Sequence, residues 1–214
     1  ARLGATVEQV APPGIPELSA ASRKTLAKLC ALFGLDGLGS GFLTTALLSY
    51  YFFERYGVSE ALIGALFFGA RLMNAASHLA AAKLASRIGL VNTMVFTHLP
   101  ANLFLMLAPF APSLEIALAL LFLRSALSSM DVAPRTALVL SLVPPAERAA
   151  ATSVTAVPRA LAAAGAPIIA GWLLASSPFG WAVVVGGGLK AGYDVLLLLA
   201  GRRLARERGA GDVT

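Results

Sequence analysis

Residues 114–142 read LEIALALLFLRSALSSMDVAPRTALVLSL, and this stretch decides the fold class. It is longer than the roughly 20 residues that a helix needs to cross a hydrocarbon core of about 30 Å. Four of its polar side chains recur at intervals of four, three and four positions: Arg124, Ser128, Asp131 and Arg135. This spacing predicts a membrane-spanning helix that gathers its polar side chains on one face.

Similar apolar runs flank this stretch at residues 25–52, 60–84, 91–110, 150–175 and 179–200. The runs are continuous rather than alternating in segments of about ten residues, which excludes a transmembrane barrel. The composition agrees, because 57% of the residues are hydrophobic and only 13% are charged. A soluble domain of 214 residues could not bury that much apolar surface. The sequence therefore predicts an all-α integral membrane protein with six transmembrane helices.

The chain divides into three predicted parts. Residues 1–22 are rich in proline and scattered polar residues, which predicts a cytoplasmic linker. Residues 23–201 form the six-helix transmembrane domain, and residues 202–214 form a basic cytoplasmic tail. Because Cys30 is the only cysteine and no Cys/His cluster accompanies it, we expect no intrachain disulfide, no metal and no other cofactor.

The orientation follows from the lysines and arginines of the short connections. If the N-terminal linker is cytoplasmic, that side collects 11 of the 17 cationic residues, the opposite side has only Arg55, and five lie inside the spans. Cationic loops stay in the cytoplasm, so both termini are predicted to be cytoplasmic. The net charge of +6 then reflects membrane topology rather than nucleic-acid binding.

Ionisable residues inside the spans are the candidate site. Each costs about 2.5 to 3.5 kcal/mol in a hydrocarbon core unless it faces protein or water. Asp36 lies about 16 Å into its span, near the midplane. Asn74 lies three positions after Arg71, on the same helical face. Four residues need a partner on another helix or a ligand, because none has an opposite charge at helical spacing: Asp36, Arg71, Arg124 and Arg159.

Two acid–base pairs have a local explanation. Asp131 with Arg135, and Lys190 with Asp194, are four positions apart, which is the spacing of an intrahelical salt bridge. A structural pairing and a role in a site stay equally open for these four residues. We interpret His98 as a hydrogen-bonded packing residue, because a lone histidine in a helix bundle most often has that role.

Small residues crowd two of the spans. Gly34, Gly37, Gly39 and Gly41 lie in the first, and small residues let helices approach closely or bend. Residues 162–171 of the fifth span predict a kinked helix that packs tightly against its neighbours. Both runs are equally consistent with simple close packing and with a hinge.

Three motifs resemble those of the major facilitator superfamily of secondary transporters, in its C-terminal six-helix half. Residues 82–89, AKLASRIG, resemble the family's loop signature Gly-x-Leu-Ala-Asp-Arg-x-Gly. Leu120 and Arg124 resemble the arginine motif of the family's fourth helix. Residues 144–148, PPAER, and 165–171, GAPIIAG, resemble its loop and eleventh helix.

The resemblance implies secondary active transport of a small solute by alternating access, without enzymatic activity. The first and fourth spans would line a central cavity, with a missing N-terminal six-helix half or a second copy as the other wall. We expect this chain and its partner unit to lie together in a lipid bilayer, the plasma membrane. The candidate substrate or coupling residues are then Asp36, Arg124, Asp131, Arg71, Asn74 and Arg159. The candidates for gating or helix packing are Arg87, Gly89, Pro167 and Gly171. Because cations outnumber acids inside the spans, the solute is expected to be anionic.

Three alternatives stay open at this point. Residues 38–41, LGSG, are similar to the serine motif of an intramembrane protease but lack its first glycine. A non-transporting membrane scaffold or subunit would use buried charges only to fix helix pairing. A complete six-helix chain working as a homodimeric transporter is the third alternative.

Overall fold

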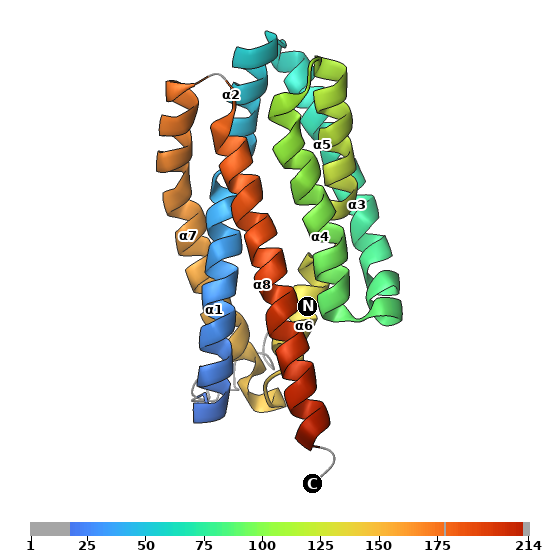
Figure 1. Cartoon of the computed structure of the whole chain (residues 1–214), viewed down its shortest axis with the longest axis vertical. Helices are drawn as coiled ribbons and strands as arrows, with labels where there is room; N and C mark the ends of the chain where they lie inside the picture. The colour runs from blue at the N-terminus through green and yellow to red at the C-terminus, as the bar shows by residue number, and fades with distance from the viewer. Residues whose placement is uncertain (1–17, 178, 212–214) are drawn as a thin grey trace, which may run out of the picture.

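The structure of the protein is a computed structural model that describes residues 18–177 and 179–211, with side chains described through residue 201 (Figure 1). Residues 1–17 of the predicted linker and 212–214 of the predicted tail lie outside the described residues. Helices dominate the described part: α1 (Ala20–Gly41), α2 (Thr45–Tyr56), α3 (Glu60–Ile88), α4 (Leu90–Leu107), the short 3-10 helix η1 (Ala108–Phe110), α5 (Leu114–Ser128), α6 (Val132–Ser141), the short 3-10 helix η2 (Pro145–Glu147), α7 (Arg148–Ser176) and α8 (Trp181–Gly211).

Within the described residues, six helical segments are long and apolar enough to cross a membrane. They run alternately up and down the bundle, so that the start of α1, the α6–α7 connection and the end of α8 lie toward one end (Figure 1). The α2–α3 and α7–α8 connections lie at the other end (Figure 1). This arrangement confirms the predicted all-α membrane fold with six transmembrane helices.

The first predicted span is interrupted rather than continuous. It breaks at residues 42–44, between α1 and α2. The hydroxyl group of Thr44 accepts a hydrogen bond from the Leu47 N–H at 3.3 Å, so Thr44 caps a new helix instead of continuing the old one. The chain therefore crosses the membrane as two stacked helices.

The fourth predicted span breaks in the same way at residues 129–131, between α5 and α6. Ser129 and Asp131 have short polar side chains that compete with backbone hydrogen bonds and weaken a helix. The expectation of one continuous helix over residues 124–135 is therefore wrong, although Arg124, Ser128, Asp131 and Arg135 all line one cavity. Each break lies in the first helix of a set of three spans, so the two breaks occupy corresponding positions.

The connection between α3 and α4 is shorter than predicted. The predicted loop motif at residues 82–89 lies inside the last turns of α3, which extends to Ile88. Gly89 alone separates the two helices, with a φ of 86°. A positive φ strains any residue with a Cβ, which explains a glycine here.

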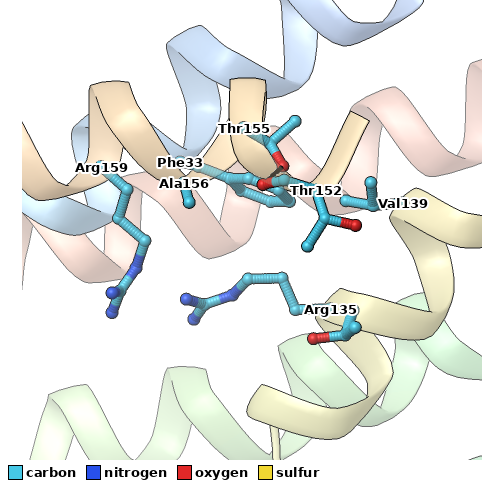
Figure 2. A pocket seen from close by; sticks show the side chains of 8 residues that line it. Phe33, Arg135, Val139, Thr152, Thr155, Ala156 and Arg159 are labelled. Carbon is cyan, nitrogen blue, oxygen red and sulfur yellow. Dashed lines mark hydrogen bonds between the residues drawn. The ribbon is translucent and has the colours of Figure 1, made fainter. Parts of the chain in front are cut away.

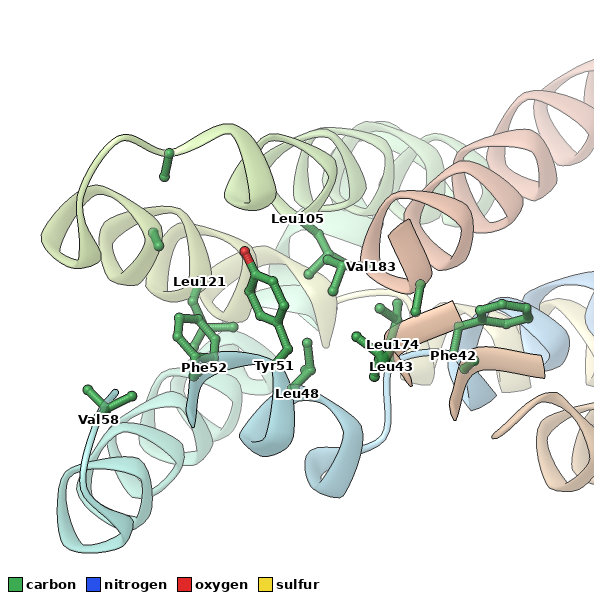
Figure 3. Close-up of a cluster of buried hydrophobic side chains, with 14 of the residues drawn as sticks. Phe42, Leu43, Leu48, Tyr51, Phe52, Val58, Leu105, Leu121, Leu174 and Val183 are labelled. Atoms are coloured by element: carbon green, nitrogen blue, oxygen red, sulfur yellow. The ribbon is translucent and has the colours of Figure 1, made fainter. Parts of the chain in front are cut away.

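Buried apolar side chains form two clusters, one toward each end of the bundle. Figure 3 shows the cluster that contains Phe42, Tyr51 and Leu105. The second cluster contains Phe33, Met94 and Tyr193 together with their neighbours. Since Phe33 of α1 belongs to one cluster and Phe42, directly after α1, belongs to the other, the buried Asp36 between them lies in a middle layer between the two clusters.

Glycines let α1 approach α7 closely. A Cβ atom at Gly37 would overlap the Arg159 carbonyl group, and one at Gly41 would overlap the Ala163 carbonyl group. Gly34 has open space at the corresponding position. Of the two interpretations left open for the first span, close packing is observed on the face that carries Gly37 and Gly41.

Two prolines lie inside α7, which continues through both of them. Each proline removes the hydrogen bond to the carbonyl group four residues earlier. Pro158 frees the Val154 carbonyl, which accepts a hydrogen bond from the Cys30 thiol at 3.5 Å. Pro167 frees the Ala163 carbonyl, which faces α1 at close range. Both prolines therefore belong to the contact between α1 and α7.

Candidate functional site

Asp36 lies at the centre of a buried group of ions in the middle layer. Its carboxylate is 0% exposed and is surrounded by cations from three other helices. Lys190 Nζ donates to Oδ1 at 2.5 Å, and Arg159 Nε donates to Oδ2 at 3.0 Å. The Arg135 Nη2 atom lies 3.3 Å from Oδ2. We call these five residues, Asp36, Asp131, Arg135, Arg159 and Lys190, the Asp36 cluster.

Asp131 enters the cluster through Arg135. The Arg135 guanidinium donates to the Asp131 carboxylate four residues earlier, so the predicted intrahelical pair is present. The same guanidinium also reaches Asp36, so it is shared by two acids on different helices. Asp36 thus ties α1 to α6, α7 and α8, as expected for a buried ion that needs partners on other helices.

The second predicted intrahelical pair is absent, because Lys190 and Asp194 each have another partner. Lys190 pairs with Asp36, and one carboxylate oxygen of Asp194 lies 2.8 Å from His98 Nδ1. The Asn102 side chain donates to the other oxygen at 2.9 Å. His98 is therefore a buried hydrogen-bonded residue, as predicted. The three residues Asp194, His98 and Asn102 are each at most 3% exposed.

Three cavities lie next to one another around the Asp36 cluster. The central cavity of about 190 Å³ lies between the two helix breaks and is lined by Ser40, Asp131 and Lys190, among others. A second cavity of about 130 Å³ lies on the Phe33 side of the cluster. Figure 2 shows this second cavity, where the side chains of Arg135 and Arg159 extend toward one another.

The third cavity, of about 170 Å³, lies on the opposite side of the cluster, between α2, α3 and α5. Two of the candidate cations, Arg71 and Arg124, line it together with Asn74. The Asn74 side-chain oxygen accepts a hydrogen bond from the Ser128 hydroxyl at 3.5 Å. We call this space the arginine cavity. Asp36, Asp131 and Arg159 are thus gathered in one cluster, while Arg71 and Asn74 line the neighbouring arginine cavity. Arg124 lines both the arginine cavity and the central cavity.

The four residues predicted for gating or packing lie away from both groups. Arg87 is exposed in the last turn of α3, beside Gly89. Pro167 contributes to the α1–α7 contact described above. At Gly171 and Gly165, no described residue lies within 4 Å of where a Cβ would stand. Tight packing of residues 162–171 therefore rests on Ala163 and its neighbours rather than on these glycines.

Sequence reasoning missed two parts of the site. Lys190 is not among the predicted substrate or coupling residues, although it pairs with Asp36 on α1. Asn102 was not singled out, because an uncharged amide in an apolar run gives little signal. His98 and Asn102 are four positions apart on α4, and this spacing is the signal that could have indicated a shared polar partner.

The described residues contain no group of three or more His, Cys, Asp or Glu side chains that could hold a metal ion. The donors that line the cavities are instead guanidinium, ammonium, hydroxyl and amide groups. Such groups suit the recognition of a polar or anionic solute, because they are hydrogen-bond donors and positive charges.

Comparison with known proteins agrees with this architecture. The sequence model of the Major Facilitator Superfamily matches residues 29–212. The chain is also 29% identical over 183 residues to the uncharacterized membrane protein YJR124C of Saccharomyces cerevisiae. That alignment covers 85% of this chain and 41% of the yeast protein, so the chain spans less than half the length of this curated relative. The match along most of the six-span bundle shows that the chain belongs to the major facilitator superfamily of membrane transporters.

Proposed function

We propose that the protein is a secondary transporter, or the C-terminal half of one, that moves a small solute across the membrane by alternating access. One observation above all supports the proposal: the buried ions lie at the level of the two helix breaks, in the middle of the bundle. Interrupted helices in corresponding positions of a repeat mark solute sites near the membrane midplane in transporters. A second six-helix unit would form the other wall.

The three cavities suit this mechanism. The central cavity is lined by residues of the Asp36 cluster, and the other two lie on either side of it, so we expect the cluster to act as the barrier between those two. Arg135 can leave Asp36, which keeps Lys190 and Arg159, while it stays paired with Asp131. The barrier can therefore open without leaving a buried charge unpaired, which would be costly in the membrane.

Cysteine labelling tests alternating access without knowledge of the solute. The intact protein would carry Cys30→Ser together with Thr45→Cys in the arginine cavity or Thr152→Cys in the cavity of Figure 2. A membrane-impermeant maleimide is added to either side of oriented vesicles. We expect each position to react from its own side only. In the double-cysteine variant, a bulky maleimide on one position should lower the labelling rate of the other, because it holds one side open.

Ser176→Cys is the matched control, because Ser176 is exposed at the far end of α7, away from the cavities. Its labelling rate should not change when Thr152→Cys is modified. Independent labelling of the two cavity positions would contradict alternating access. That result would favour the second candidate function, a membrane scaffold whose Asp36 cluster only fixes helix pairing.

The same labelling tests the proposed orientation, in which both termini are cytoplasmic. The cationic connections support it, since Arg23, Lys83 and Arg148 all belong to the end of the bundle that would face the cytoplasm. Thr152→Cys lies toward that end and should react only when the reagent reaches the cytoplasmic face. Reaction from the outer face alone would reverse the orientation.

A further inference from the structure

The arginine cavity contains two cations and no acid. Its lining includes Arg71 from α3 and Arg124 from α5, and the other described residues around it are apolar, hydroxyl or amide side chains. Asn74 and Ser125 supply neutral polar groups on the same wall. Two like charges that share a cavity repel each other, so this arrangement is unfavourable unless something negative lies between them.

Neither arginine has an ionic partner among the described residues. The Nε atom of Arg124 is buried and makes no hydrogen bond there. Arg71 has a single hydrogen bond, from Nη2 to the Thr45 hydroxyl at 3.4 Å, which is long for a guanidinium. A guanidinium group carries five N–H donors in a planar fork, so most of this hydrogen-bonding capacity is unused.

The nearby acids already have cationic partners. Asp36 contacts Lys190, Arg159 and Arg135, and Asp131 contacts Arg135. Asp131 lines the central cavity together with Arg124, but it is paired with Arg135 and forms no ion pair with Arg124. A ligand can therefore supply the negative charge that the arginine cavity lacks.

The N-terminus of α2 adds to the positive potential of the cavity. This helix begins at Thr45, which is one of the lining residues. Thr44 caps the N–H of Leu47, and the first two N–H groups of the helix have no partner within the helix itself. The end of a half-helix directed at a midplane cavity favours an anionic group on a solute.

We propose that the transported solute carries an oxyanion group, a carboxylate or a phosphate, and that this group binds between Arg71 and Arg124 at the N-terminus of α2. The inference rests on the proposed transport function and names the chemistry of its solute. A planar guanidinium matches both oxyanions, because two parallel N–H groups bind two oxygens at once.

The depth of the cavity selects a free solute rather than a lipid headgroup. Arg71 is about 16 Å from the start of α3 and Arg124 about 15 Å from the start of α5, at 1.5 Å per residue. Both therefore lie near the middle of a hydrocarbon core of about 30 Å. A cavity of about 170 Å³ has room for about six water molecules, which suits one charged group of a small solute.

A binding experiment on the intact protein tests the inference. The protein is purified in an uncharged detergent, and its thermal unfolding midpoint is measured with sodium phosphate, sodium succinate or tetraethylammonium chloride at constant ionic strength. We expect a saturable rise with at least one of the two oxyanions and none with tetraethylammonium, because a bound ligand stabilises the folded state. Arg124→Gln and Arg71→Gln should each weaken this binding by about tenfold or more.

Arg148→Gln is the charge-matched control, because Arg148 is exposed at the start of α7. Its response to the oxyanions should equal that of the wild type. Arg124→Lys keeps the charge without the planar fork and should bind with intermediate affinity. It also tests the site if Arg124→Gln fails to fold.

Several outcomes would overturn the inference. The unfolding midpoint would show no saturable response to either oxyanion, or Arg124→Gln would respond as strongly as the wild type. A loss of binding in Arg148→Gln as large as that in Arg124→Gln would have the same consequence. Stabilisation that requires phosphatidylglycerol in the micelle would assign the site to a lipid headgroup instead. If both cavity cysteines show alternating access but no oxyanion binds, the transport proposal stands and this inference fails. If an oxyanion binds but the two cavity cysteines are labelled independently, the oxyanion site stands and the transport proposal fails.

Discussion

The Asp36 cluster and the arginine cavity are neighbours in one polar layer, but their charges are organised in opposite ways. Around Asp36, each charged side chain contacts at least one of opposite sign, at distances such as 2.5 Å to Lys190 and 3.0 Å to Arg159. Arg124 shares the central cavity with Asp131, but no described acid forms an ion pair with it. A satisfied network stabilises a particular packing of helices, whereas an unsatisfied one is a cost that a ligand can remove.

This difference assigns different properties to the two regions. Changes in the Asp36 cluster should mainly alter stability, because they leave buried charges without partners. Changes at the two arginines of the arginine cavity should mainly alter ligand binding, because no ion pair within the described chain is lost. Four substitutions test this separation.

The largest expected loss of stability is that of Asp36→Asn. The change removes the acid that three cations share, and breaking a buried ion pair costs about 3 to 5 kcal/mol. The measurement is the unfolding free energy of the intact protein in detergent. Glu54→Gln, at an exposed position in α2, is the matched control and should have little effect.

A double variant sharpens this result. Adding Lys190→Met to Asp36→Asn removes the cation with the shortest contact to the acid, so part of the lost stability should return. A double variant that is as unstable as the sum of the two single variants would show that the two charges are not coupled. The Asp36 cluster would then not be the stabilising network that its geometry indicates.

The second substitution tests the helix contact beside the cluster. Gly37→Ala places a methyl group against the Arg159 carbonyl, so α1 has to move away from α7, and overpacking of this kind costs about 1 to 3 kcal/mol. Gly34→Ala is the control on the same helix, because open space surrounds it. It should leave stability unchanged or raise it slightly, since alanine favours helices. Equal effects of both variants on the unfolding free energy would contradict close packing at Gly37.

The third substitution tests the polar group on α4 and α8. Asn102→Ala removes one of the donors to the buried Asp194 carboxylate and should cost about 1 to 2 kcal/mol, because His98 keeps its own contact. Asn92→Ala on the same helix is the control, since Asn92 is exposed and bonds only to the Ile88 carbonyl. If both variants unfold at the same denaturant concentration as the wild type, the Asn102 contact contributes nothing to stability.

Much of the fold could be predicted because the signal is local. Continuous apolar runs require helices in a membrane, and the six-span bundle follows from their lengths and connections. The two helix breaks could not be predicted from hydrophobicity. At residues 42–44 and 129–131 the helical backbone is interrupted, but the sequence on both sides stays apolar, so each span looks continuous in its hydropathy. The first break depends on a capping contact by Thr44 that spans only three residues.

The candidate site could be predicted in part of its membership but not in its pairing. Asp36, Arg71, Arg124 and Arg159 could be singled out because a charge in a membrane span is costly wherever it lies. Which charges pair depends on how the helices pack, and four-residue spacing was misleading for Lys190. Gly39 lets α8 approach α1, because a Cβ there would overlap the Lys190 side chain and the Gly186 carbonyl group, and Lys190 reaches Asp36 rather than the acid on its own helix.

The smallest expected loss of stability is that of Arg124→Gln, and it separates the two regions most directly. Glutamine removes a buried charge that has no acidic partner among the described residues and that shares its cavity with Arg71. The unfolding free energy without ligand should therefore stay the same or rise, because the cost of burying the charge and its repulsion disappear. Arg135→Gln is the matched variant in the Asp36 cluster, where the same change leaves two acids short of a cation and should cost several kcal/mol. A loss at Arg124→Gln as large as that at Arg135→Gln would mean that Arg124 has an acidic partner after all, and the contrast between a paired cluster and an unpaired cavity would not hold.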